Sequence, residues 1–326
     1  DGKKEVYFIG NRSGYAGIYR VPCDVKGSKP PDPDIVVQGE KTEEFEAFHL
    51  FQSKIDISAD GRLAFVTKSG ENDALHIFDL GTNRTEATYH FSGLVVIGTA
   101  SWSPDARRLV FSAVDKTGSS DLYVWDRDSE KLERITNDIY DDRDPAWSPD
   151  GGTIVFSSDR TPTGKSGSYN LFLLDAQTGD IRYLTLGTES YAAPAWSPDG
   201  GALMFTSDLG GARNVWMLKM HGNEPDGPMK KLTSLMTAAF DPAWADSDLV
   251  YAAFENFGFQ LRKGGNAYGL YDSSDVSRAS APDVSDTLWR PGSIAGSDEG
   301  SERRYEKEYR LDVANSAIVT APGFGT

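Results

Sequence analysis

One pattern of about fifteen residues occurs repeatedly along this chain. Its clearest copy is "AWSPDGGTIVFSSDR" at 146–160, and further copies begin at residues 99, 193 and 241. The tryptophans Trp102, Trp147, Trp196 and Trp244 lie 45 to 49 residues apart, and the weaker copy "IDISADGRLAFVTK" places Ile57 another 45 residues upstream. A period of this length is typical of folds built from repeated supersecondary units.

Each copy continues in the same way, with short β-branched and aromatic runs separated by Gly, Asp, Asn and Ser. Such runs favour antiparallel strands, and with the Trp-bearing strand they give four strands per unit. Four-stranded units at this spacing predict an all-β, six-bladed β-propeller of four-stranded antiparallel blades. Its first blade, containing Ile9, lacks an inner strand. The predicted units lie near 5–40, 55–90, 99–137, 144–186, 193–234 and 241–272.

The composition changes after the last repeat, near residue 275. We therefore expect a propeller over 1–275 and a partly ordered extension over 276–326, which is rich in Ser, Asp and Gly. Two interpretations of this extension stay open: it closes the first blade as a strand, or it is a linker that leads into a further domain. The chain begins without Met, which indicates a processed terminus or a cut inside a longer protein.

The pattern "WSPDG...I.F.SDR...LF..D..TG....LT" at 147–185 resembles the repeats of TolB-like propellers, which are related to WD40 repeats. The resemblance covers roughly residues 5 to 260. It implies a scaffold for protein–protein interaction in the periplasm of a bacterial cell envelope. The tail, with "EYRLD" and then "GFG", is similar to junctions where such a propeller leads into an outer-membrane β-barrel, so attachment to a barrel in the full-length chain is a further expectation.

Charge and composition exclude several classes of function. The net charge of −16 repels phosphate backbones, so we expect no nucleic-acid partner. No apolar stretch approaches the roughly 20 residues of a transmembrane helix. Cys23 is the only cysteine, which excludes an internal disulfide and a cysteine-based metal cluster.

The loops that lead into the inner strands are the best candidates for a binding site, because in a propeller they gather at one mouth of the central channel. Aromatic rings beside carboxylates suit a protein or peptide ligand. The expected partner-binding residues are Tyr140, Asp141, Asp142, Arg143, Asp144, Tyr191, Phe240 and Asp241. The acidic loop also offers oxygen ligands for calcium at Asp138, Asp141, Asp142 and Asp144. However, the loop lacks the residue spacing of a calcium-binding loop. A solvated acidic rim is therefore favoured, and no cofactor is expected.

Signals for catalysis are weak within this chain. It has no Gly-x-Ser-x-Gly nucleophile turn, and its histidines, His49, His76, His90 and His221, are scattered over different units. We therefore expect a non-catalytic propeller. The alternative is an accessory propeller of a larger prolyl-oligopeptidase-like hydrolase, or a propeller polysaccharide lyase.

The charged and aromatic residues of the repeat itself have a structural explanation. Asp159 and Arg160 stand at a strand end, where we expect them to cap a turn or to pair within their blade. The four repeated tryptophans are expected to fill space between blades.

Overall fold

The second strand of each repeat is buried on both of its faces. Every residue of β14 (Thr153–Ser158) and of β18 (Ala202–Ser207) is buried. Sheets that stack face to face bury both sides of their middle strands, so these strands read as continuous apolar runs and not as an alternation of apolar and polar residues.

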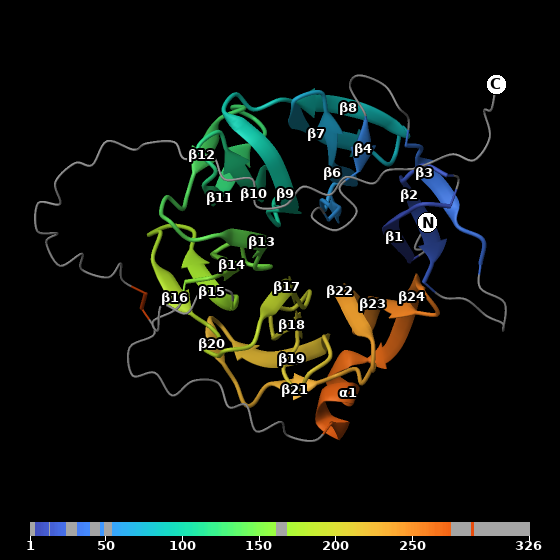
Figure 1. The fold of residues 1–326 in the computed structure, drawn as a ribbon, viewed down its shortest axis with the longest axis vertical. Coiled ribbons are helices and arrows are strands. Elements are labelled where there is room, and N and C mark those ends of the chain that lie inside the picture. Colours follow the sequence, from blue (N-terminus) through green and yellow to red (C-terminus); the bar gives the residue numbers. More distant parts are fainter. Residues whose placement is uncertain are drawn as a thin grey trace, which may run out of the picture. The chain divides into compact units, whose positions relative to one another are not determined.

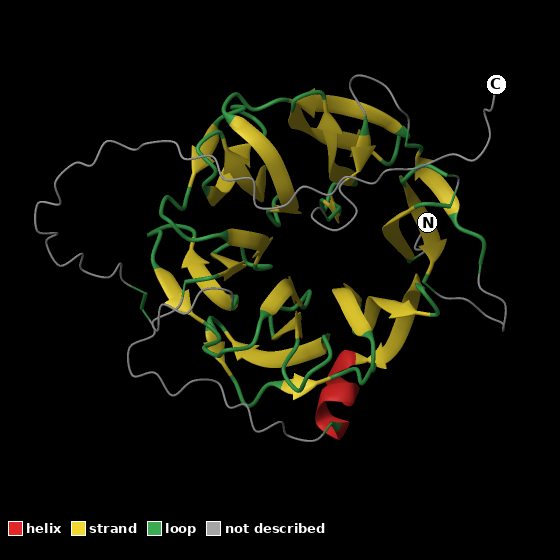
Figure 2. Cartoon of the chain, in the orientation of Figure 1, coloured by secondary structure: helices red, strands yellow, loops and turns green. Residues whose placement is uncertain are grey.

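The computed structural model describes residues 4–12, 14–23, 31–39, 46–48, 54–160, 168–274 and 288–289. Within them six sheets follow one another around a central channel, in the order of the sequence (Figure 1). The prediction of an all-β, six-bladed propeller is therefore confirmed, and α1 (Ala267–Ser273) is the one helix among the described elements (Figure 2). No helix in this part of the chain is long and apolar enough to cross a membrane.

The blades are numbered here from the N-terminus. Blade 1 consists of β1 (Glu5–Gly10), β2 (Gly17–Pro22) and β3 (Asp34–Val37). Blade 2 consists of β4 (Ala47–Phe48), β5 (Asp56–Ile57), β6 (Arg62–Ser69), β7 (Asn72–Asp79) and β8 (Arg84–Tyr89). Blade 3 consists of β9 (Leu94–Trp102), β10 (Arg108–Asp115), β11 (Ser120–Asp126) and β12 (Leu132–Arg134).

Blade 4 consists of β13 (Asp142–Trp147), β14, β15 (Asn170–Asp175) and β16 (Ile181–Tyr183). Blade 5 consists of β17 (Tyr191–Trp196), β18, β19 (Asn214–His221), β20 (Glu224–Pro225) and β21 (Lys230–Lys231). Blade 6 consists of β22 (Ala238–Ala245), β23 (Asp248–Glu255) and β24 (Gly258–Asn266), and α1 follows it.

Four blades depart from the four-stranded pattern: the sheets of blades 2 and 5 have five strands, and those of blades 1 and 6 have three among the described residues. In blade 1 the inner strand is absent from the described sheet, as the sequence predicts. Blade 6 also has three strands, which the sequence did not predict; its chain enters α1, where the Asn266 side chain accepts a hydrogen bond from Gly269 N at 2.9 Å and caps the helix. The suggested closing strand within 276–326 lies outside the described residues, apart from Leu288 and Trp289.

The Ser-Pro-Asp-Gly turn holds the first two strands of a blade together. Ser148 Oγ donates to Asp150 and accepts from Thr153 N at 3.0 Å, while Gly152 N donates to Asp150 Oδ1 at 3.0 Å. The same bonds recur around Ser197 and Asp199. These bonds satisfy backbone donors that the turn would otherwise leave unpaired, so the repeated Asp is structural.

The residue after this Asp adopts a left-handed backbone conformation. Its φ is 71° at Gly151 and 72° at Gly200, values that glycine reaches without steric cost. In the copy in blade 3 the same place is taken by Ala106, whose φ is 58°. The alanine therefore stores local strain that the other blades avoid.

The repeated tryptophans belong to the core, as expected. Trp102 and Trp147 are 5% and 6% exposed and sit in clusters that span two neighbouring blades. Trp196 and Trp244 are partly buried against the next clusters along the ring. The packing of one blade on the next thus explains why these rings repeat.

Candidate binding site at the central channel

All six blades contribute to a cavity of about 610 Å³ along the channel. Each inner strand presents its Pro-Ala-Trp segment or its equivalent to this space. The charged side chains that line it are Lys54, Asp56, Asp144 and Asp241. The channel is therefore acidic at its wall, with apolar surface between the carboxylates.

Three inner strands carry the same irregularity where they enter the channel wall. Asp144, Ala193 and Asp241 occupy equivalent positions, and their φ angles are 50°, 55° and 47°. The register of each strand shifts there against its neighbour. Such bulges turn a side chain away from the regular sheet and occur often beside functional sites.

The two aspartates at these bulges are bonded differently. Asp144 accepts a hydrogen bond from Thr99 Oγ1 at 2.8 Å and another from Ala193 N at 3.0 Å, so it links blades 3, 4 and 5. Asp241 lies 3.5 Å from Lys54 Nζ, and its side chain is 60% exposed. Asp241 can therefore accept a further hydrogen bond from a ligand, whereas Asp144 mainly joins blades.

Asp56 joins blade 2 to blade 3 deeper in the channel wall. Its carboxylate accepts from Trp102 N at 2.7 Å and from Ile57 N at 2.8 Å. Desolvation raises the pKa of Asp56 to about 6, although these hydrogen bonds oppose the shift. Its position at the joint between two blades makes its role structural.

The acidic loop from 137 to 144 divides its carboxylates between different surroundings. Asp141 N donates to Asp159 Oδ1 at 2.9 Å, and Asp141 Oδ2 accepts from Tyr169 OH at 2.8 Å and from the Arg143 guanidinium. Burial opposes ionisation of Asp141, but these hydrogen bonds outweigh it and the pKa is lowered. The Arg143 guanidinium also lies 4.4 Å from the Tyr169 ring centroid, so this group is fixed in place.

Asp142 points into blade 4 and meets Arg160 there. Both side chains are 0% exposed, and Arg160 also pairs with Asp138 at 2.6 Å. Burial raises the pKa of Asp142 to about 6, and the attraction of Arg160 opposes that shift. Arg160 thus pairs within its blade, as the sequence predicts for a charged residue at this strand end.

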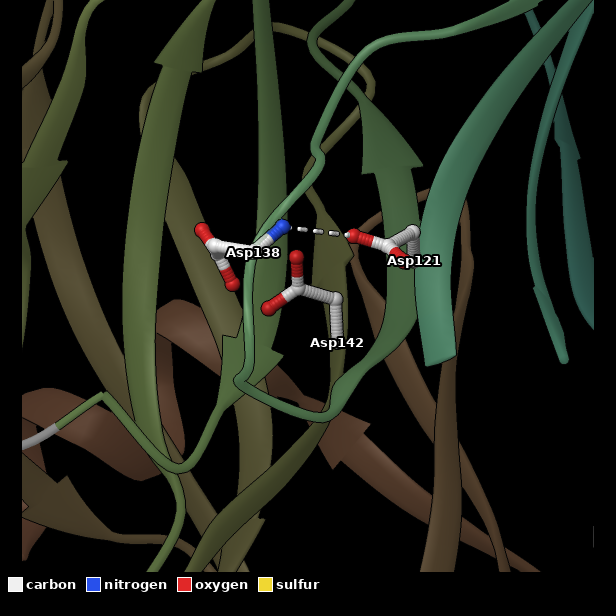
Figure 3. Close-up of side chains that lie close together, drawn as sticks. All are labelled: Asp121, Asp138 and Asp142. Atoms are coloured by element: carbon white, nitrogen blue, oxygen red, sulfur yellow. Dashed lines mark hydrogen bonds between the residues drawn. The ribbon is translucent and has the colours of Figure 1, made fainter. Parts of the chain in front are cut away.

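Three carboxylates converge here and invite comparison with a metal site (Figure 3). Oxygens of Asp121, Asp138 and Asp142 all lie within 4.8 Å of one another. Arg134 pairs with Asp121, and Arg160 pairs with the other two. Two guanidinium groups therefore already compensate most of the negative charge of this cluster, and each of the three carboxylates has a cationic partner without a metal ion.

The four calcium candidates do not come together around one point. Asp138 and Asp142 face Arg160, Asp141 faces Arg143 and Tyr169, and Asp144 bonds Thr99 and Ala193. We therefore derive no calcium site from the described residues.

The eight predicted contact residues also separate by exposure. Asp144 and Asp241 line the channel. Asp142 and Tyr191 are 0% and 2% exposed, inside blade 4 and blade 5 respectively. Tyr140 is partly buried and packs edge-on against Trp289 at 6.0 Å. Burial in the blade cores thus takes Asp142 and Tyr191 out of the surface that a ligand can touch.

One face of the propeller carries exposed apolar side chains that sequence reasoning missed. The loop into each inner strand and the hairpin between the second and third strands lie at the same end of a blade, because neighbouring strands are antiparallel. At this end Ile139 is 93%, Met236 98% and Phe257 101% exposed. This surface is called the entry face below.

Phe257 is the most unusual of these residues. It sits at the tip of the β23–β24 hairpin with φ 61°, next to Asn256 at φ 50°. Positive φ is rare for a bulky residue, and such turns normally take Asn or Gly. The signal was readable in "FENFGFQ", where a turn has a phenylalanine in place of glycine.

The aromatic hairpin is continuous with the channel. Phe259 contacts Phe254 and Phe240, with ring centroids 5.3 and 5.7 Å apart, and it is 51% exposed. Leu261, on the same strand, lines the channel cavity. An apolar path therefore leads from the exposed hairpin to the channel wall.

Comparison with known proteins identifies the repeat. Residues 55–165 match the model of the TolB beta propeller domain. The fold is similar to TolB from Acinetobacter baumannii, at 20% identity and a TM-score of 0.60, over 81% of this chain and 61% of that one. The chain thus spans about three fifths of that TolB.

Two enzymes contain similar propellers. An oligogalacturonate lyase from Vibrio parahaemolyticus matches at 16% identity and a TM-score of 0.54, over 80% of this chain and 86% of that one. A prolyl endopeptidase matches at 13% identity and a TM-score of 0.51, over 81% of this chain and 40% of that one. At these identities the likeness shows the fold alone.

Proposed function

We propose that this chain, a TolB-like β-propeller, is a non-catalytic binding module that holds a protein or peptide partner against its entry face and channel mouth. The observation that carries the proposal is that Ile139, Met236 and Phe257, each almost fully exposed, all lie at the same end of the blades. Large apolar side chains exposed on one face suit contact with a partner. The likeness to TolB supports a location in the periplasm or at the outer membrane of a bacterial envelope.

The partner should combine apolar and basic side chains. The entry-face residues need an apolar surface to bury against, and the Asp241 carboxylate at the mouth favours a cation. The net charge of −16 adds a long-range attraction for basic partners. These features do not depend on a bound metal or cofactor.

A role without catalysis agrees with the state of His76. This residue is 4% exposed inside blade 2, within hydrogen-bond distance of Thr67 and Thr88 at 2.7 and 3.0 Å. Burial lowers the pKa of His76 to about 4, so it stays neutral. An enclosed neutral ring cannot reach a substrate in the channel, so His76 is not available as a catalytic base for the lyase alternative.

The accessory-domain alternative keeps one supporting observation. The likeness to a prolyl endopeptidase covers 40% of that chain, so the rest of that protein has no counterpart in this comparison. A nucleophile turn in a continuation of the gene would favour this candidate over the first.

The proposal is tested by affinity capture from envelope extract. One variant carries Ile139→Ser, Met236→Ser and Phe257→Ser on the entry face. Its control carries Arg107→Ser and Gln177→Ser, two exposed residues in the turns at the opposite end of the blades. We expect the control to retain the partners of the unchanged chain and the entry-face variant to lose them. Equal capture by both variants would remove the entry face as the site.

A further inference from the structure

The inner edge of blade 1 is a row of backbone groups beside which the described residues place no strand. Cys23 N donates to Lys4 O, which fixes the alternation of hydrogen bonds between β1 and β2. Val6 and Phe8 therefore bond β2, and the N–H and C=O groups of Glu5, Tyr7 and Ile9 point to the other side. In the described sheet order no strand lies on that side.

The other blades show what normally occupies this edge. In blade 3 the inner strand β9 pairs with β10, and Trp102 stands opposite Leu109. Ser103 N donates to Arg108 O at 2.8 Å, and Ser103 Oγ accepts from Arg108 N at 2.9 Å. Blades 4 and 5 repeat this arrangement with Trp147 and Trp196.

The same positions can be located in blade 1 by register. Phe8 pairs with Tyr19 as Phe111 pairs with Tyr123 in blade 3. Counting back along both strands, Val6 corresponds to Leu109 and Glu5 to Arg108. A strand on this edge would place its large apolar residue opposite Val6 and a hydroxyl residue beside Glu5.

A cavity of about 400 Å³ lies along this edge. It is bounded by β1, by the segment from Ile55 to Ile57 in blade 2 and by the segment from Ala243 to Asp246 in blade 6. An inner strand of blade 1 would stand in this space, between its two neighbouring blades. Its wall is apolar at Val6 and Ile57, where a ring can pack.

Side-chain contacts link blade 1 to blade 6 at the wall of this cavity. Lys4 forms an ion pair with Asp246, and Lys263 Nζ lies 3.4 Å from Cys23 O. Elsewhere in the ring the inner strands pack directly on one another, as β9, β13, β17 and β22 do. The junction of blades 1 and 6 is therefore the place where an added strand completes the packing.

We propose that the open edge of β1 binds an extended segment of a partner protein by strand addition. The segment runs antiparallel to β1 and carries Trp or another large apolar residue followed by Ser or Thr, in the manner of the chain's own Pro-Ala-Trp-Ser segments. Backbone hydrogen bonds to Glu5, Tyr7 and Ile9 provide affinity, and the ring opposite Val6 provides specificity. This inference is independent of the entry face, because the two surfaces use different residues.

The direct test uses a fluorescein-labelled synthetic peptide, "YAAPAWSPD", which copies residues 191–199. Its binding to the full chain is followed by fluorescence anisotropy. We expect saturable binding that weakens at least tenfold, or by about 1.4 kcal/mol, when the peptide's Trp is replaced by Ala, because the ring provides most of the apolar surface that the peptide can bury. Absence of saturable binding to the full chain would overturn the proposal.

Two proline variants of the protein locate the binding edge. Tyr7→Pro removes an N–H that faces the gap and keeps the hydrogen bonds between β1 and β2. Ile35→Pro is the matched control, because Ile35 stands opposite Tyr19 and its N–H faces away from β2 at the other edge of the same blade. We expect Tyr7→Pro to reduce affinity at least tenfold and Ile35→Pro to leave it unchanged, with thermal unfolding confirming that both variants fold. Equal affinities would overturn the assignment.

A chain ending at Trp289, the limit of its first compact unit, distinguishes a partner strand from the chain's own extension. Equal peptide affinities of the full and shortened chains support strand addition by a partner. Binding that appears only after shortening would mean that residues beyond Trp289 already occupy the edge, and it would overturn the proposal.

Discussion

Replacing Arg160 by Met should destabilise the protein more than any change on its surface. The guanidinium is fully buried and donates to both carboxylate oxygens of Asp142, to Ser158 Oγ at 2.9 Å and to Asp138 at 2.6 Å. Methionine keeps much of the apolar stem but leaves the Asp142 charge buried without a cationic partner. Breaking a buried ion pair in this way costs about 3–5 kcal/mol.

The loss of stability in Arg160→Met should depend on pH, and the protonation of Asp142 decides in which direction. Its pKa is already raised to about 6 in the folded protein, above about 3.9 in an unfolded chain. Removal of Arg160 takes away the attraction that held this pKa down, so it rises further. The folded variant then takes up a proton that the unfolded chain lacks, and lowering the pH from 7.5 to 5 reduces the loss of stability relative to the unchanged protein.

Urea unfolding at pH 7.5 and pH 5, followed by tryptophan fluorescence, measures both effects. Arg143→Met is the matched control, since that side chain is 54% exposed and its surface ion pair contributes less than about 1 kcal/mol. Asp142→Asn added to Arg160→Met should remove most of the pH dependence. A loss below about 1 kcal/mol at pH 7.5, or a loss that does not shrink at pH 5, would refute the reasoning.

Three further predictions concern turns. Ser148→Ala should lower the free energy of unfolding by about 1–3 kcal/mol, because Thr153 N loses its acceptor; denaturant titration checks this, and an unchanged midpoint would contradict it. Ala106→Gly should raise the free energy of unfolding by up to about 1 kcal/mol, because glycine adopts the left-handed backbone conformation without strain. Ala113→Gly, inside β10, is the control and should lower the free energy of unfolding. Thermal unfolding compares the two variants. Phe257→Gly should raise the melting temperature and weaken partner capture, since strain and exposure coincide at that residue; a variant that captures as well as the unchanged chain would show that the ring serves no contact.

Much of the fold could be predicted because the same sequence pattern occurs in several units. The Ser-Pro-Asp-Gly turns, the Trp-bearing strands and the missing inner strand of blade 1 all follow from comparing copies. The three-stranded blade 6 and helix α1 did not, since "NAYGLYDS" at 266–273 occurs in no other unit. Comparison of the units predicts only the features that several units have in common.

The candidate site was harder to predict, because exposure is decided between residues far apart in the sequence. Asp142 and Asp144 are two positions apart, yet one pairs with Arg160 inside blade 4 and the other reaches Thr99 in blade 3. In a regular strand, residues two positions apart point to the same face, so the bulge at Asp144, where φ is 50°, is what turns the two side chains apart. An acidic loop in a sequence does not reveal which carboxylates face the ligand and which face an arginine.

The sequence by itself determined the repeat, the number of blades and the structural role of the repeated Ser-Pro-Asp-Gly turn, since these depend on bonds between residues a few positions apart. Only the tertiary structure decided that Tyr191 is enclosed, that Ile139, Met236 and Phe257 share one face, and that the edge of β1 adjoins a cavity between blades 2 and 6. Tyr191 is enclosed by the packing of blade 4 on blade 5, and the cavity beside β1 depends on a ring that brings the first and last blades together. Contacts between residues so far apart in the chain are not encoded in any local pattern.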